Sequence, residues 1–359
     1  MLDRVIISGG GTGGHIYPAI AIADELKLRN PNIEILFVGA SDRMEMEKVP
    51  QAGYEIKGLW ISGFQRSLSL KNLAFPFKLF WSVIKAYFIV KKFKPQVAIG
   101  TGGYASGPTL FVANKTGVPT LIQEQNSFPG ITNRLLSKTV DSIAVAYSGM
   151  ERFFPKNITR ITGNPVRRDL IDIPDPKQVD YEFFGLNPQK PVLLVLGGSL
   201  GSKRVNALIG ENLEWILGMG VQVIWQTGKI YFDQYSARVQ KGVAIHAYIS
   251  DMAKVYSLSN FIISRAGASS VSELALAAKP VMFIPSPNVA EDHQRKNAEA
   301  VVEKSAAIMI VENDLDSFES VFEKWINDSD DSLKLAENFK KMALPNATST
   351  IVNEIENLI

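Results

Sequence analysis

The 359-residue sequence is 46% hydrophobic and contains no cysteine and three histidines, which excludes a disulfide framework or a thiolate zinc site and argues against a histidine-rich metal centre. Its length and hydrophobic content suit two domains of ordinary size rather than one. The net charge of +2 hides an asymmetry, with 19 Lys and Arg against 11 Asp and Glu in residues 1–163, and 19 against 25 in the remainder. An anionic partner is therefore expected for the first half.

The charges are also unevenly spaced within the first half. No Asp or Glu occurs between Glu55 and Glu124, whereas that interval contains nine Lys and Arg. These basic residues are interleaved with Trp, Phe and Leu rather than with polar groups, so nucleic acid is not the expected partner. The sequence has no signal-peptide core near Met1 and no run of about eighteen apolar residues, so we expect a cytoplasmic chain.

Apolar runs alternate with amphipathic stretches along the whole chain, which is typical of an α/β fold. The runs are continuous Val, Ile and Leu segments, and this indicates parallel sheets covered by helices on both faces. Strands are predicted at 5–8, 33–39, 97–100, 119–124 and 142–146 in the first half, and at 192–197, 221–227, 243–248, 261–265 and 280–285 in the second.

The two halves follow one plan. Residues 5–26 and 192–213 both read as strand, glycine loop and helix, and residues 97–119 resemble residues 261–280 in the same way. We therefore predict two doubly wound, Rossmann-like domains that face each other across a cleft, with ligands at the carboxyl ends of the strands. The predicted domains are 1–163 and 164–345, and a last helix at 346–359 is a candidate to pack back on the first domain.

The first glycine loop, SGGGTGGH at 8–15, directly follows the first predicted strand. It matches the G-x-G-x-x-G pattern of dinucleotide-binding loops, but the second predicted strand does not end on the acidic residue that would bind a ribose. A P-loop is excluded because no Gly-Lys-Ser/Thr closes the loop. A tight turn explains one or two of its five glycines, whereas so many allow backbone N–H groups to approach an anion, which predicts a phosphate neighbour.

Three further loops of this kind lie at 100–108, 197–201 and 264–273. The last is rich in serine and opens a predicted helix, which suits a diphosphate, and Glu273 follows within reach of a ribose diol. Alternatively, Ser269 or Ser270 is the N-cap of this helix and Glu273 its capping-box partner. Four such loops in two domains predict two phosphorylated ligands, and hence group transfer rather than hydrolysis.

Eight short motifs occur in order along the chain: GGTGGH at 10–15, GTGGYASGP at 100–108, EQN at 124–126, GNPVR at 163–167, GGSLG at 197–201, ISDM at 249–252, RAGASSVSE at 265–273 and EDHQRKNA at 291–298. Together they resemble the MurG family of bacterial transferases (glycosyltransferase family 28), which add N-acetylglucosamine to the lipid-linked muramyl-pentapeptide of peptidoglycan synthesis. The resemblance covers nearly the whole chain. It implies a B-type glycosyltransferase fold, UDP-N-acetylglucosamine as donor, undecaprenyl-linked lipid I as acceptor, inversion at the anomeric carbon, and neither a cofactor nor an obligatory metal.

The resemblance also implies site residues, carried over motif by motif. Expected to contact UDP-N-acetylglucosamine are Thr12, Gly13, Gly14, Asn126, Arg167, Ser199, the backbone of Ile249, Ala268, Ser269, Ser270, Val271, Ser272, Glu273 and Gln294. Expected near the acceptor diphosphate are Gly102, Gly103 and Tyr104. Backbone donors, serine hydroxyls and Arg167 would then stabilise the departing diphosphate without a metal ion.

The acceptor hydroxyl needs a general base, which is worth about 10²–10⁴ in rate. His15, at the end of the first glycine loop, is the first candidate, and Glu124 is its rival. The alternative for His15 is a side chain that only caps the helix or orients a substrate. His246 lies in a predicted strand and is expected to be structural, whereas His293 neighbours Gln294 and is a candidate to line the sugar pocket.

A basic and apolar segment at 69–94 predicts contact with a membrane. On a helix, Lys71, Lys78, Lys85 and Lys92 form one stripe, beside a second stripe of Leu73, Phe77, Phe80 and Ile84. The alternative is a buried helix whose lysines extend to water. The absence of acids from 56 to 123 favours peripheral binding to an anionic bilayer, at the cytoplasmic face of the inner membrane.

Three other functions are weighed against this one. Another B-type glycosyltransferase or a UDP-sugar epimerase would use the same fold, although an epimerase needs no lipid contact. A membrane-bound nucleotide-sugar sensor without turnover is the non-enzyme alternative, and the presence of His15 and Glu124 argues against it. Proteins of the cell-wall machinery are further candidate partners.

Overall fold

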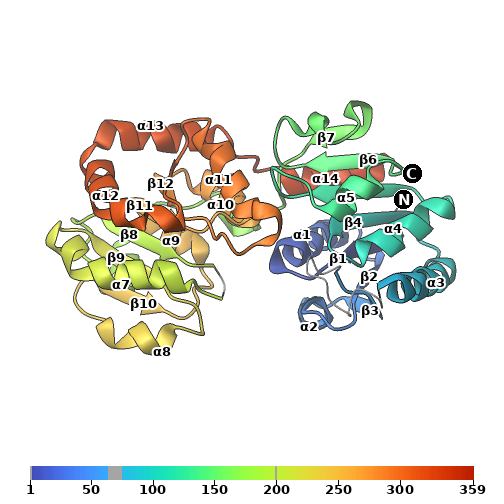
Figure 1. Ribbon diagram of the computed structural model, residues 1–359, viewed down its shortest axis with the longest axis horizontal. Coiled ribbons are helices and arrows are strands. Elements are labelled where there is room, and N and C mark those ends of the chain that lie inside the picture. The colour runs from blue at the N-terminus through green and yellow to red at the C-terminus, as the bar shows by residue number, and fades with distance from the viewer. Residues whose placement is uncertain (1, 64–74, 199) are drawn as a thin grey trace. The chain divides into compact units, whose positions relative to one another are not determined.

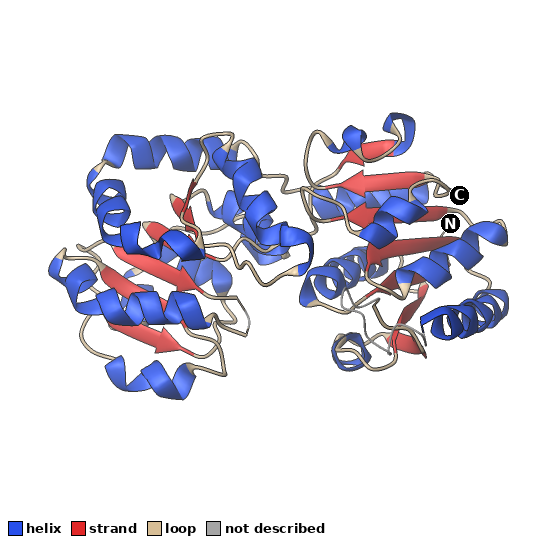
Figure 2. Ribbon diagram, viewed as in Figure 1, coloured by secondary structure: helices blue, strands red, loops and turns tan. Residues whose placement is uncertain are grey.

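The computed structural model describes residues 2–63, 75–198 and 200–359 (Figures 1 and 2). The chain divides into two compact units, the first formed by Met1–Val166 with Leu344–Ile359 and the second by Arg167–Ala343. The division after Val166 lies three residues beyond the boundary read from the sequence. The chain returns to the first unit at Leu344, so the first unit is discontinuous in sequence and the second is continuous.

The first unit is a parallel seven-stranded sheet in the order β3-β2-β1-β4-β5-β6-β7. Its strands are β1 (Arg4–Gly9), β2 (Glu34–Ala40), β3 (Glu55–Leu59), β4 (Val97–Gly102), β5 (Thr120–Glu124), β6 (Ser142–Val145) and β7 (Thr159–Ile161). Its α-helices are α1 (Gly13–Arg29), α2 (Glu45–Gln51), α3 (Phe75–Phe93), α4 (Ser106–Lys115), α5 (Ile131–Leu136) and α14 (Ala347–Glu356). Short 3₁₀ turns, η2 (Met150–Arg152) and η3 (Lys156–Ile158), precede β7.

The second unit is a parallel six-stranded sheet in the order β10-β9-β8-β11-β12-β13. Its strands are β8 (Val192–Leu196), β9 (Gln222–Gln226), β10 (Val243–His246), β11 (Phe261–Ser264), β12 (Val281–Phe283) and β13 (Ile308–Met309). Its α-helices are α6 (Gln178–Phe183), α7 (Lys203–Gly218), α8 (Phe232–Tyr235), α9 (Met252–Leu258), α10 (Ala268–Ala277), α11 (His293–Val302), α12 (Phe318–Asn327) and α13 (Ser329–Lys340). Four 3₁₀ turns complete it: η4 (Arg168–Leu170), η5 (Ser236–Arg238), η6 (Ala290–Asp292) and η7 (Glu312–Ser317).

All ten predicted strands are confirmed, and so is the doubly wound fold. The strands that the sequence did not predict, β3, β7 and β13, each lie at an edge of a sheet. They are short or mixed in polarity, with β3 reading EIKGL and β13 only two residues long. These three strands are partly exposed or very short, so they lack the continuous apolar run that marks the others.

Helices cover both faces of the first sheet, which explains its apolar strands (Figure 2). Ile7 of β1 packs with residues of α1 and α14, whereas its neighbour Ile6 packs on the other face with Ala86 and Val90 of α3. The C-terminal helix α14 contributes Ile351, Val352 and Ile355 to this core. Its polar side is held by Arg29 of α1, whose guanidinium binds the Glu356 carboxylate at 2.7 Å.

The two sheets reverse their strand order at equivalent places. In the first, β1 lies between β2 and β4, and in the second, β8 lies between β9 and β11 (Figure 1). The four glycine loops follow β1 and β4 in the first unit and β8 and β11 in the second. Each unit therefore carries two loops side by side, at the carboxyl ends of neighbouring strands. Ligands of doubly wound sheets bind at such switch points.

Candidate functional site

The two glycine loops of the first unit interlock. The N–H of Gly10 donates to the carbonyl of Gly102 at 3.2 Å, and the Thr101 hydroxyl donates to the carbonyl of His15 at 2.8 Å. A Cβ on Gly103, whose φ is +88°, would overlap the backbone of Gly10. Glycine is therefore needed in these loops because they pack closely together. The sequence had indicated only that the glycines let backbone N–H groups approach an anion.

His15 lies in the first turn of α1, with its ring against Gly102 of β4. Its Nδ1 is 2.9 Å from the carbonyl oxygen of Gly10 and 3.3 Å from the hydroxyl of Thr12. Because a carbonyl can only accept, the hydrogen bond to Gly10 places the proton on Nδ1 and leaves a lone pair on Nε2. This tautomer, inferred from the bond partner, is the one that a general base requires.

Glu45, the first residue of α2, was not predicted to belong to the site. Its side chain is 1% exposed. One carboxylate oxygen accepts from the N–H of Gly11 at 2.8 Å and the other from the N–H of Ala40, at the end of β2, at 2.9 Å. A Cβ on Gly10 or Gly39 would overlap this side chain. Dinucleotide-binding folds have an acidic residue at the end of the second strand that binds a ribose. Here the carboxylate of Glu45 lies near the end of β2, but it binds the glycine loop instead.

The structure gives Glu124 a different environment from that of His15. Glu124 is 2% exposed, at the end of β5. One oxygen accepts from the backbone and side-chain amides of Asn126, at 3.0 and 3.1 Å, and the other from Gly130 and Asn133, at 3.1 and 2.9 Å. Four donors thus occupy both oxygens, which favours a carboxylate that organises the loop carrying Asn126 over one that abstracts a proton.

In the second unit, three predicted donor-site residues lie together. Arg167 places Nε at 3.9 Å from the Glu273 carboxylate and donates from its guanidinium to the carbonyl of Ser250 at 3.2 Å, next to Ile249. Burial raises the pKa of Tyr256 well above its ordinary value, and the negative charge of Glu273 raises it further. Burial likewise raises the pKa of Glu273, and the charge of Arg167 opposes that shift.

The residue that positions Ile249 was also missed. Gln226, the last residue of β9, accepts from the N–H of Ile249 at 2.8 Å and donates to the carbonyl of Gly198 at 3.2 Å. It therefore joins the glycine loop after β8 to the segment that the family motif assigns to the nucleotide base. Ser199, in the same loop, lies outside the described residues.

Helix α10 begins at Ala268, with Gly267 as its N-cap. The alternative capping box of Ser269 or Ser270 with Glu273 is therefore wrong, because Glu273 lies in the second turn. The first N–H groups of a helix have no intrahelical acceptor, and the buried hydroxyl of Ser269 has no hydrogen-bond partner among the residues that the structure describes. Ser272 instead donates back to the carbonyl of Ala268 at 3.3 Å.

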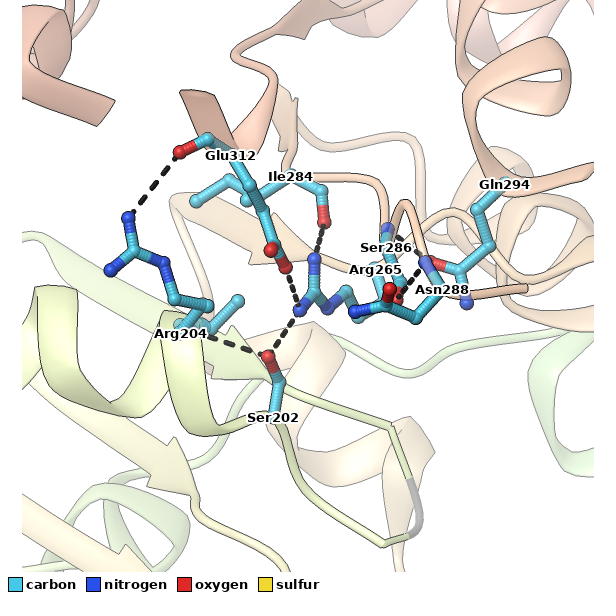
Figure 3. A network of polar contacts seen from close by, with 9 residues as sticks. Ser202, Arg204, Arg265, Ile284, Ser286, Asn288, Gln294 and Glu312 are labelled. Carbon is cyan, nitrogen blue, oxygen red and sulfur yellow. Dashed lines mark hydrogen bonds and ion pairs between the residues drawn. The ribbon is translucent and has the colours of Figure 1, made fainter. Parts of the chain in front are cut away.

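A polar network extends from the loop after β8 to Gln294 (Figure 3). The buried Arg265 donates to Ser202, to Glu312 and to the carbonyl of Ile284. Ser202 in turn caps α7, by accepting from the N–H of Val205 at 3.2 Å. Two residues beyond Ile284, the N–H of Ser286 donates to the Gln294 side chain at 2.9 Å. The predicted sugar contact is thus bound to the segment that Arg265 holds at Ile284.

Helix α3 exposes an apolar face. Phe77 is 68% and Phe88 64% exposed, and Phe80 and Trp81 are exposed as well, whereas Ser82, Ala86 and Val90 on the opposite side are buried. The alternative of a buried helix is therefore wrong for this face. Together with Trp60, α3 forms a hollow of about 700 Å³ lined by Trp60, Trp81, Ile84, Lys85, Phe88, Ile89 and Lys92.

Of the predicted basic stripe, Lys85 and Lys92 are exposed. Lys78 turns toward the domain, donating to the Ser62 hydroxyl at 3.0 Å and lying 5.5 Å from the centre of the Trp60 ring. Lys71 and Leu73 lie outside the described residues. Within the described parts of the chain, no helix is both long enough and apolar enough to cross a bilayer.

Two doubly wound parallel-sheet units, each with paired glycine loops at its switch point, match the fold of B-type glycosyltransferases. The family comparison agrees: residues 5–145 match the glycosyltransferase family 28 N-terminal domain and residues 192–353 match the family 28 C-terminal domain. The chain belongs to glycosyltransferase family 28.

Similar proteins cover the full length of the chain. It is 58% identical to a UDP-N-acetylglucosamine–N-acetylmuramyl-(pentapeptide) pyrophosphoryl-undecaprenol N-acetylglucosamine transferase of Christiangramia forsetii, over 99% of this chain and 98% of that one. It is 56% identical to the protein of the same name from Flavobacterium psychrophilum, with the same coverage. Among solved structures, MurG of Acinetobacter baumannii superposes with a TM-score of 0.79 at 26% identity, covering 99% of both chains.

Proposed function

We propose that this chain transfers N-acetylglucosamine from UDP-N-acetylglucosamine to the muramyl sugar of lipid I, the pentapeptide-bearing pyrophosphoryl-undecaprenol acceptor, giving lipid II for peptidoglycan synthesis. The observation that carries the proposal is the 58% identity, over 99% of this chain, to a transferase named for that reaction. The glycine loops, His15 and Glu273 support the proposal as groups able to bind phosphate, take a proton and bind a ribose.

The first unit is proposed to supply the base. Nε2 of His15 takes the proton of the muramyl C4 hydroxyl, and the resulting oxygen nucleophile attacks the anomeric carbon of N-acetylglucosamine. The bond from that carbon to the diphosphate oxygen breaks, its electron pair leaves with UDP, and the configuration inverts. The Nδ1–H bond to Gly10 supports this role because it leaves Nε2 unprotonated. Glu124 is assigned a positioning role through Asn126.

The second unit is proposed to hold the donor. Glu273 would bind the ribose, Arg167 and the first turn of α10 the diphosphate, the backbone of Ile249 the uracil, and Gln294 the sugar. The hydroxyl of Ser269, at the start of that helix, has no hydrogen-bond partner in the part of the chain that the structure describes, and this supports the diphosphate assignment. Negative charge that builds on the departing diphosphate would thus meet N–H groups, hydroxyls and a guanidinium.

The acceptor diphosphate is proposed to contact the loops of the first unit, at Gly102, Gly103 and Tyr104 and at the first turn of α1. The N–H of Gly11 donates to Glu45, so that group is engaged, whereas the helix start at Gly13 and Gly14 offers other donors to an anion.

Peripheral attachment to the cytoplasmic face of an anionic membrane is proposed through α3. Its exposed aromatic residues lie beside Lys85 and Lys92, and each such lysine near the surface contributes about 1 kcal/mol. Flotation with anionic vesicles tests this attachment, comparing wild type with Phe77→Ser/Phe80→Ser and with Lys85→Gln/Lys92→Gln. We expect less protein on the vesicles for both variants and for wild type at high salt. Equal recovery of all three would contradict the proposal.

The activity is tested directly by incubating the protein with UDP-N-acetylglucosamine and a short-chain lipid I analogue. We expect release of UDP together with a disaccharide product, unchanged by EDTA. UDP release without disaccharide would indicate hydrolysis, and an epimerised UDP-sugar would indicate the rival activity.

A further inference from the structure

The peptide group between Gly10 and Gly11 is hydrogen-bonded on both sides. Its N–H, on Gly11, donates to the carboxylate of Glu45 at 2.8 Å, and its C=O, on Gly10, accepts from Nδ1 of His15 at 2.9 Å. In a trans peptide these two bonds lie on opposite sides of one planar, conjugated unit. Glu45 and His15 are thus the two ends of a single chain of hydrogen bonds, although α2 and α1 carry them separately.

Hydrogen bonds in series polarise one another. A negative charge at the N–H shifts electron density toward the carbonyl oxygen, which then becomes a stronger acceptor for Nδ1–H. The Glu45 side chain is 1% exposed, so water screens this effect little. A stronger acceptor at Nδ1–H favours the imidazolium that forms when Nε2 takes a proton, just as a carboxylate does when it binds a catalytic histidine directly.

The local packing keeps this chain of bonds in place. The second oxygen of Glu45 is held by the N–H of Ala40 at 2.9 Å, and Gly10 and Gly39 leave the space that the side chain fills. Nearby titratable groups make other contacts: the Tyr17 ring of α1 lies against Gly13 and the Tyr104 ring against Gly63. Lys48 of α2 pairs with Glu47 at 3.0 Å.

We propose that Glu45 is a positioning residue for the base, acting on His15 through the Gly10–Gly11 peptide group as a carboxylate–peptide–histidine relay. This proposal rests on the proposed role of His15. The relay orients the imidazole, fixes its tautomer and strengthens Nε2 as a base, while Glu45 itself remains out of contact with both substrates.

The test is Glu45→Gln, which keeps the length of the side chain but removes its charge and replaces one of its two acceptor oxygens with an NH₂ group. We expect kcat to fall about tenfold, the lower end of the effect seen when metal-binding histidines lose a hydrogen-bonded partner, while KM for both substrates changes less than about twofold. Without the carboxylate charge, the Gly10 carbonyl is a weaker acceptor and stabilises the imidazolium of His15 less. The acidic limb of the kcat–pH profile should therefore move to lower pH. Glu45→Asp, which keeps the charge, should return that limb toward its wild-type position.

Glu47→Gln is the matched control, since it removes one charge from an exposed side chain of the same helix and should leave both kcat and the limb unchanged. A purely structural role of Glu45 would lower the melting temperature of Glu45→Gln and leave the acidic limb in place, and that result would overturn the proposal.

A second readout does not depend on activity. With ¹⁵N-labelled histidine, the chain gives three ring systems, and the His15→Ala spectrum assigns the one at position 15. We expect the Nδ1–H tautomer in the wild-type protein and a downward move of the ring's titration midpoint in Glu45→Gln. An Nε2–H tautomer in wild type would overturn the relay even if no Glu45 variant folded. The two proposals can also fail separately. If His15→Ala kept its turnover, but the titration midpoint of the His15 ring still moved in Glu45→Gln, the base assignment would fail and the relay would stand.

Discussion

The loops after β1 and after β8 occupy equivalent places in two sheets of the same strand order, yet they are supported differently. In the first unit, the side chain of Glu45 fills the space between the glycine loop and the end of β2. In the second, backbone meets backbone: a Cβ on Gly201 or Gly228 would overlap the chain on the other side. The fold thus places each loop, and the contact beneath it differs: a carboxylate side chain in the first unit and a second backbone segment in the other.

The largest expected effect would separate chemistry from donor binding. His15→Ala should reduce turnover by about 10²–10⁴, the usual worth of a general base. UDP affinity should be nearly unchanged, because the residues assigned to the uracil, ribose and diphosphate lie in the other unit. Turnover across pH and calorimetry with UDP measure the two quantities. A variant that kept most of its turnover, with an intact acidic limb, would return the role of base to Glu124 or to solvent.

A complementary effect is expected in the second unit. Glu273→Ala should weaken UDP binding by roughly 1.5–3 kcal/mol, the usual loss for a hydrogen bond to a charged group. Acceptor affinity should be nearly unchanged, which isothermal calorimetry and the acceptor KM would check. Unchanged UDP affinity would remove Glu273 from the donor site.

The support of the two loops can be compared by adding one methyl group to each. Gly201→Ala places a side chain at a φ of +81° and against the carbonyl of Thr227, so it should cost about 1–3 kcal/mol. In Gly10→Ala the new methyl group instead meets the side chain of Glu45. The double variant Gly10→Ala/Glu45→Ala removes that side chain and should recover part of the stability lost in Gly10→Ala. Denaturant unfolding measures both. Additive effects of the Gly10 and Glu45 changes would show that the two residues do not share the space.

The smallest effect concerns stability and pH. Burial raises the pKa of Glu273 above its ordinary 4.5, so the folded protein favours the protonated carboxyl. That contribution to stability is complete below the unfolded pKa and is lost as pH rises through the raised folded value. Glu273→Gln should therefore gain melting temperature over wild type at pH 8 and little or none at pH 4. An equal difference at both values would show that the pKa of Glu273 is not raised.

Sequence patterns predicted the central strands and the four loops, because apolar runs and glycines are local signals. The partnership of Glu45 with Gly11 could not be read in this way, since it joins residues 34 positions apart through a contact that only the folded chain creates. The start of α10 could not be read from the sequence either, because Ser269 and Ser270 both offer caps and only the backbone shows that Gly267 is the N-cap.

Helix α3 shows a different limit. Its sequence is apolar on nearly every side, so periodicity alone did not establish which side the domain covers. Ala86 and Val90 face the core, as small and medium side chains that fit against the sheet, whereas Phe77 and Phe88 are exposed. The shortage of acids in the flanking sequence, a property of the surface rather than of packing, was the better signal for this face.

The return of α14 to the first unit has a consequence for the order of events on the ribosome. Residues of α14 complete a core that begins with Leu2 and Val5, and chains emerge from the N-terminus at about 5–20 residues per second. The first unit therefore remains short of Ile351, Val352 and Ile355 until α14 has been made, and by then the continuous second unit, which ends at Ala343, has all of its residues. The half of the molecule that is made first is the half that can finish folding only last.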